Sequence, residues 1–291
     1  MPPRASVTDR ALVLPPLYSL VTLREAGDAF AHACRIAGEQ GAGTLVWVRR
    51  FDVAEFAVVL EPEEPLREAR RAFLVGMNAL ADTLTGFAPP TMGISFDWPD
   101  ALRVDGVLVG GGRLGWPECG EEDVPDWLVF SATVRTTVIR ATDPGMRPLL
   151  GALDEIGFEA IDAGEIVASF ARHLMAGFHD WAEGGFGSVE ARFSSRLAVG
   201  AAAPGGPAPN PSPQGGGEPA YFGGEERADS AEREARLPPH VWGMAGVGVA
   251  PSSAPNSDFM LGNRDEGDLD RLRGALLAPS WRDPRTGMPW L

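Results

Sequence analysis

The segment 96–114 contains the densest group of residues that could bind a ligand. It reads FDWPDALRVDGVLVGGGRL, so that Trp98 and Asp100 precede three consecutive glycines, Gly110–Gly112. Glycines that follow a strand let a ligand come close to main-chain N–H groups, as in anion-binding nests. No G-x-G-x-x-G spacing opens a helix here, which excludes a dinucleotide-binding fingerprint. A glycine-rich turn or bulge in a hairpin explains the same residues, and the spacing alone leaves both interpretations open.

All 25 of the strongly basic side chains are arginines, because the sequence contains no lysine. A Schiff base, a P-loop lysine and a lysine general base are therefore excluded. Arg113, directly after the glycines, and Arg49 or Arg50 could provide positive charge instead, since a guanidinium binds carboxylate or phosphate through paired hydrogen bonds. Solvated charges at strand ends are the alternative interpretation of these three arginines.

The overall charge limits the classes of partner. The 25 basic and 40 acidic residues give a net charge of −15, which repels phosphate backbones and anionic lipids, so we expect neither a nucleic-acid nor a membrane partner. The N-terminal apolar run, 11–14, is too short for a signal peptide, and no stretch approaches the ~20 apolar residues of a membrane span. Two cysteines are too few for a disulfide framework, which predicts a reducing cytoplasm.

Neither the cysteines nor the histidines form a catalytic or metal-binding pattern. Cys119 lies among acidic residues that would raise the pKa of its thiol, so we interpret it as an unreactive loop cysteine. Cys34 is interpreted as a small buried apolar residue of a helix. His173 and His179 are six positions apart, whereas two histidines that bind one metal from a helix are four apart. We predict surface histidines and no metal site.

Apolar periodicity predicts an α+β domain over residues 17–197. A T-x-x-E capping box at Thr22 and Glu25 predicts a first helix that ends at Gly41. The other predicted elements are strands at 44–50, 55–62, 94–114 and 127–139 and helices at 66–84, 148–156 and 164–181. Their order predicts helices that cover a mixed or antiparallel sheet.

The regions outside this domain differ from it in composition. Residues 1–16 are interpreted as an N-terminal extension and 198–262 as a flexible linker, since about half of the residues from 200 to 224 are glycine or proline. Residues 263–291 form a short C-terminal segment with a predicted helix at 268–277. Its two tryptophans, Trp281 and Trp290, predict that this segment docks on the domain.

The motif in the segment 96–114 resembles that of the biotin/lipoate A/B protein ligase family. Trp98, Pro99 and Asp100 stand where the family has its WPND residues. Residues 104–106 stand where it has VDG, and residues 109–111 where it has LAG. The resemblance extends over about residues 17–197, through GAGTLVWV, FAVVLEPEEPL and the helices that follow the sheet.

The resemblance implies both a fold and an activity. The fold would be that of the class II synthetases and biotin/lipoate ligases. Such ligases use ATP and Mg²⁺ to activate biotin or lipoate as an acyl-adenylate and pass the acyl group to a lysine of a carrier domain; others transfer octanoyl groups between carriers. We expect the glycines to line the principal pocket. The expected ligand-binding residues are Arg49, Arg50, Trp98, Asp100, Gly110, Gly111, Gly112 and Arg113.

Departures from the family pattern argue against full activity. Leu108 stands where the family has a lysine before the glycine turn, and Asp97 stands where it has a cation before the tryptophan. The family's glycine- and arginine-rich loop, which covers the adenylate, is reduced here to Arg49 and Arg50. An adenylating site must neutralise phosphate charge, so no catalytic residue is assigned. Two functions follow as hypotheses. One is a ligase-like enzyme with degenerate catalysis, whose cleft lies between residues 98–112 and the Arg49 hairpin. The other is a non-catalytic binding or assembly protein on the same fold.

Overall fold

A mixed sheet of seven strands forms the centre of the protein. The computed structural model describes residues 12–25, 27–138, 151–159, 161–198 and 265–282. The strand order is β1-β2-β3-β7-β6-β5-β4, with β1 and β2 parallel and the other neighbouring pairs antiparallel. The strands are β1 Ser19–Leu23, β2 Thr44–Val48, β3 Val53–Leu60, β4 Ile94–Asp97, β5 Ala101–Val104, β6 Val107–Gly115 and β7 Leu128–Arg135. The predicted α+β sheet is confirmed.

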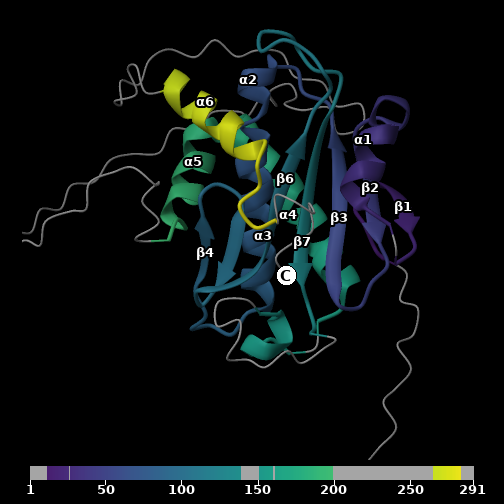
Figure 1. Cartoon of the computed structure of the whole chain (residues 1–291), viewed down its shortest axis with the longest axis vertical. Coiled ribbons are helices and arrows are strands. Elements are labelled where there is room, and N and C mark those ends of the chain that lie inside the picture. The colour runs from purple at the N-terminus through teal and green to yellow at the C-terminus, as the bar shows by residue number, and fades with distance from the viewer. Residues whose placement is uncertain (1–11, 26, 139–150, 160, 199–264, 283–291) are drawn as a thin grey trace, which may run out of the picture.

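Helices cover both faces of this sheet (Figure 1). α3 and α4 pack against each other and against one face, while α1 packs against β2, β3 and β7 on the other. The short α2 contacts α6. The helices are α1 Ala29–Gln40, α2 Leu66–Ala69, α3 Ala72–Phe87, the 3-10 helix η2 Leu153–Ile156, α4 Ala163–Gly184, α5 Phe186–Ser195 and α6 Asp265–Leu276.

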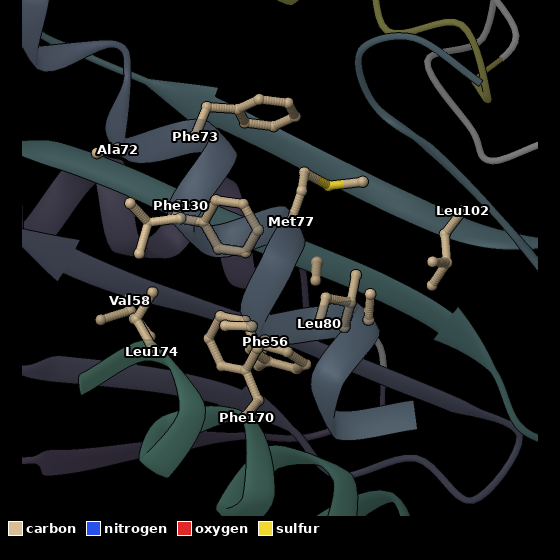
Figure 2. Packing of buried hydrophobic residues seen from close by; sticks show 14 of the residues in the cluster. Phe56, Val58, Ala72, Phe73, Met77, Leu80, Leu102, Phe130, Phe170 and Leu174 are labelled. Atoms are coloured by element: carbon tan, nitrogen blue, oxygen red, sulfur yellow. The ribbon is translucent and has the colours of Figure 1, made fainter. Parts of the chain in front are cut away.

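The two faces follow from the alternation of side chains along each strand. On β3, Phe56 and Val58 join the core under α3 and α4, whereas Ala57 and Val59 face α1. Aromatic rings fill the core under α3 and α4 (Figure 2). The ring centres of Phe170, on α4, and Phe56 are 4.6 Å apart. Alternate residues of β3 and β7 therefore point to the α1 face. On β6 a β-bulge shifts the alternation, so that Leu108 and Gly111, three positions apart, both face Trp281.

The predicted first helix at Thr22 is wrong. Residues 19–23 form β1, which pairs with β2 in parallel, and α1 begins only after Asp28. The carboxylate of Asp28 accepts a hydrogen bond from the main-chain N–H of Ala31 at 2.8 Å and so caps the helix. Sheet pairing thus outweighs the local capping pattern of Thr22 and Glu25. The predicted hairpin of β2 and β3 is confirmed.

The predicted helix at 148–156 is also wrong in its extent. The structure has only the four-residue η2 there, which ends at Gly157 in a left-handed conformation, and residues 148–150 lie outside the described part. The predicted linker, except residue 198, and Trp290 also lie outside the described part. The C-terminal helix is confirmed as α6, and Trp281 is fully buried. No helix in the described part is both long and apolar enough to span a membrane.

Two glycines of α3 test the packing of the core. A methyl group on Gly76 would lie 2.3 Å from the ring of Phe130, whereas Gly86 has open space around it. We expect Gly76→Ala to lower the free energy of unfolding by roughly 1–3 kcal/mol through overpacking. Gly86→Ala is the matched control and should raise it by up to about 1 kcal/mol, because alanine is the better helix former. Urea unfolding measures both values, and equal effects would contradict the packing described.

Candidate functional site

Charged groups of both signs gather on the α1 face of the sheet. Glu55, on β3, accepts a hydrogen bond from the main-chain N–H of Ala29 at 3.0 Å, so its carboxylate lies at the start of α1. Burial raises the pKa of Glu55, and the nearby charges of Arg50 and Arg282 act in the opposite direction. Asp28 is a second carboxylate nearby, and its negative charge also raises the pKa of Glu55. Four separate parts of the chain thus contribute to one cluster.

Arg113 of β6 is the cation of this cluster that lies on the sheet itself. Its guanidinium carbon is 3.8 Å from the centre of the Phe30 ring of α1. Burial, and then the like charge of Arg282, lower the pKa of Arg113 to about 10. Within the described part of the chain, the Arg113 side chain makes no hydrogen bond or ion pair. A half-buried arginine of this kind is suited to bind an anion.

The three glycines do not border open space, contrary to the expectation that they line the principal pocket. A methyl group on Gly110 would lie 1.9 Å from a carbonyl oxygen of β7, and one on Gly112 would lie 2.6 Å from the sulfur of Met77. At Gly111 it would lie 2.5 Å from the indole of Trp281. The absence of side chains is therefore used for close packing, and an indole of the protein itself fills the space over Gly111. A ligand site at these glycines stays a prediction.

Asp100 is bound by the same C-terminal segment. Its two carboxylate oxygens accept hydrogen bonds from the main-chain N–H of Ser280 at 2.8 Å and from the Ser280 hydroxyl at 2.7 Å. Asp100 is 1% exposed, and burial raises its pKa from 3.8 to about 6 despite these hydrogen bonds. The carboxyl group that sequence reasoning assigned to a ligand thus has a partner within the chain.

Leu108, at the position of the family's lysine, lies in an apolar cluster with Ala101 and Trp281. The indole N–H of Trp281 donates a hydrogen bond to the main-chain oxygen of Gly112 at 3.1 Å. An ammonium group at position 108 would therefore be buried against an indole instead of facing a phosphate. Position 108 is thus apolar in its surroundings as well as in its residue type.

Trp98 lies on the other side of the sheet from this cluster. It packs against the core under α3 and lines a cavity of about 260 Å³ between α5 and α6. The guanidinium carbon of Arg271, on α6, lies 4.4 Å from the centre of its ring. The structure therefore does not bring Trp98 together with Gly111 and Arg113.

Arg49 and Arg50 line a second cavity, of about 990 Å³, at the ends of β1 and β2 and the start of α4. Arg50 donates two hydrogen bonds to the carboxylate of Asp52, at 3.0 and 2.7 Å, and this pairing lowers the pKa of Asp52. Arg50 also interacts electrostatically with Glu55, which belongs to the charged cluster on the α1 face. Of the two predicted arginines, Arg50 is thus the one linked to Arg113, through Glu55.

The structure places Cys34 half-buried on α1 and Cys119 in the loop between β6 and β7. Burial raises the pKa of Cys34 to about 11, and burial followed by Asp123 raises that of Cys119. His179 is exposed and lies 3.3 Å from Glu183, one turn along α4. Among the residues that the structure describes, no group of three or more His, Cys, Asp or Glu side chains is arranged to hold a metal ion.

Sequence reasoning missed the residues that complete this face. Glu55 gave no signal, because a lone acidic residue in a strand is ordinarily solvated. The docking of Trp281 was predicted, but not where it docks, since Ser280 and Asp100 are 180 positions apart. Arg282 follows directly and lies 5.4 Å from the Trp281 ring centre. Asp28 is the exception, because an aspartate directly before an apolar helical pattern is a recognisable N-cap and would have indicated where α1 begins.

A mixed seven-stranded sheet with this arrangement of helices defines a biotin protein ligase-like fold. A solved biotin protein ligase-like protein of unknown function from Silicibacter sp. TM1040 is 29% identical, with 64% of this chain and 80% of that chain covered and a TM-score of 0.58. The apo structure of biotin protein ligase from Aquifex aeolicus is 15% identical over 62% and 78% of the two chains, with a TM-score of 0.51. A point mutant of that ligase in complex with biotin gives a TM-score of 0.50 at the same identity and coverage.

The family model of the biotin/lipoate A/B protein ligase family matches residues 14–195. The chain therefore belongs to this family. No curated protein matches the sequence. The match ends where α5 ends, at Ser195, so α6 and the segment after it lie beyond the part that the family model describes.

The buried carboxyl of Asp100 gives a pH-dependent stability. Its pKa is raised on folding from 3.8 to about 6, so its contribution is fully present below about pH 4 and is lost as the pH rises through 6. Relative to Asp100→Asn, which cannot titrate, the free energy of unfolding should fall by roughly 2–2.5 kcal/mol from about pH 4 to about pH 7. Urea unfolding at both pH values measures this difference. An unchanged difference would contradict the buried, desolvated carboxyl.

Proposed function

We propose that the chain binds an acyl group of the biotin or lipoate class through its carboxylate, with degenerate ligase catalysis. One observation carries the proposal: Arg113 is a half-buried cation without an ion pair in the described residues, while the family's lysine position, Leu108, is 7% exposed in an apolar cluster. The half-buried charge of Arg113 favours a carboxylate ligand, and the apolar surroundings of Leu108 disfavour activation of that carboxylate. Biotin, lipoate and octanoate share this carboxylate.

The residues of this face do not fit ATP and Mg²⁺. A nucleotide needs cations that neutralise its phosphates in the transition state. Here Arg50 is already paired with Asp52, and the carboxylates of Asp28 and Glu55 share the field of Arg113. We therefore derive no adenylation step at this site.

A ligase-like enzyme that acts on a biotinyl or lipoyl carrier domain is the second candidate. Membership of the family favours it. It requires another residue to supply the charge of the missing lysine, and Arg113 is the available cation on β6. In that case the acceptor would be a lysine of the carrier, because this chain has none. The two candidates differ in whether the bound acid is activated.

Removal of the Arg113 charge tests the binding site. We expect Arg113→Gln to weaken the binding of biotin, lipoate or octanoate by about 1.5–3 kcal/mol, the usual value of a charge-assisted hydrogen bond. Isothermal titration calorimetry measures this loss. Arg172→Gln is the matched control, because Arg172 is an exposed arginine of α4 on the opposite face. Equal affinities of the two variants would remove Arg113 from the site.

Exchange between ATP and pyrophosphate, with biotin or lipoate present, tests the loss of catalysis. We expect a rate far below about 1 per second, the lower end of ordinary enzyme turnover. Leu108→Lys should gain little, because the new ammonium would be buried beside Trp281. Exchange at about 1 per second or faster by the unmodified protein would show that another residue supplies the charge, and would favour the enzyme.

A further inference from the structure

The C-terminal residues Ser280 and Trp281 contact three positions that define the expected acyl-group site. Ser280 binds both carboxylate oxygens of Asp100, and Trp281 covers Gly111 and packs against Leu108. These positions come from the motif of the sheet, whereas the two contacting residues lie beyond the part that the family model matches. A segment added outside the family domain thus meets the centre of that domain.

The shape of the contact is that of a ring in a slot. The walls of the slot are Gly111, Ala101 and Leu108, and the indole between them is fully buried. The indole N–H donates to the main-chain oxygen of Gly112 at 3.1 Å, so the slot contains one polar acceptor among apolar surfaces. Such a slot is suited to a compact ring that carries an N–H donor, and less suited to a simple alkyl chain.

Two cations lie beside the slot: Arg113 is two residues after Gly111 on β6, and the guanidinium of Arg282 lies 5.4 Å from the centre of the Trp281 ring. Arg282, the next residue, lies close enough to Arg113 for the two like charges to lower the pKa of Arg113. A carboxylate attached to a ring in the slot would therefore lie near Arg113, with Arg282 as a competing or additional cation.

α6 holds this segment close to the slot. Leu272 and Leu276 are buried, and Arg273 lies 3.2 Å from a carboxylate oxygen of Glu121. Figure 1 shows the chain turning from α6 towards β6 after the helix. Because α6 has contacts of its own, residues 277–282 can leave the slot without separation of the whole C-terminal segment from the domain.

We propose that Trp281 is a built-in occupant of the acyl-group site and takes the place of the ring of a bound acid. This rests on the proposed function, since it assumes that this face binds the acyl group. Ligand and Trp281 cannot fill the slot together, so the ligand binds only the fraction of molecules from which the segment is released. The observed affinity is reduced by that fraction.

Calorimetric titration of the full chain with biotin, lipoate and octanoate tests the proposal. Biotin carries a fused ring with N–H donors, whereas octanoate has neither feature. We expect Trp281→Ala to bind biotin at least about tenfold more tightly than the unmodified chain, with a smaller gain for octanoate. Trp127→Ala is the matched control, because it removes a partly buried indole that packs against α1, away from the slot. It should leave the affinity unchanged.

A second variant and a second measurement test the proposal even if Trp281→Ala does not fold. Ser280→Ala removes one hydrogen bond to Asp100 and should raise biotin affinity a few-fold while the protein stays folded. Biotin should also increase the hydrogen exchange of residues 277–282 in the unmodified chain, because the N–H of Ser280 loses its partner.

The outcomes separate the two proposals. If the unmodified chain binds biotin and both variants bind it equally or more weakly, Trp281 is a wall of the site, and the inference is wrong while the proposed function stands. Decreased exchange of residues 277–282 on binding would have the same meaning. If none of the three acids binds any variant, the proposed function fails, and the inference fails with it.

Discussion

The contact between Gly111 and Trp281 is the interaction on which the arrangement of the α1 face depends. A strand without a side chain at this position lets an indole lie directly against its backbone, since a methyl group there would be 2.5 Å from the ring. Burial of a tryptophan side chain contributes on the order of 4–6 kcal/mol before the ordering entropy is subtracted. That contact fixes Ser280 over Asp100 and brings Arg282 towards Arg113.

The same sheet separates this face from the main core. Alternation along β3 sends Phe56 to the aromatic core under α3 and α4, and Glu55 to the α1 face. The core side is filled by apolar and aromatic side chains. The α1 face is shared by a helix N-terminus, two strands and the C-terminal segment, so charged groups of both signs meet there. The site is thus a consequence of covering only part of a face with a helix.

Patterns that depend on neighbours in sequence predicted much of the fold, including the β2–β3 hairpin, α3 and α4. They failed at Thr22, where a capping pattern was overruled by parallel pairing of residues 19–23 with β2. The site was predicted less well, because its partners are remote in sequence. Gly111 was selected for an open pocket, and only the docking of Trp281, 170 positions away, shows what fills that space. Trp98 follows the motif, yet it points to the core side.

In the proposed arrangement, the indole of Trp281 occupies the slot over Gly111 until an acid displaces it. Nuclear magnetic resonance of the protein labelled with ¹⁵N-tryptophan follows it directly, with the indole N–H of Trp281 assigned by its loss in Trp281→Phe. We predict that this N–H is protected from solvent exchange in the free protein, because it donates to the main-chain oxygen of Gly112, and that biotin at saturation abolishes the protection. Rapid exchange in the free protein, or protection that persists with biotin bound, would show that Trp281 is not a displaceable occupant of the slot.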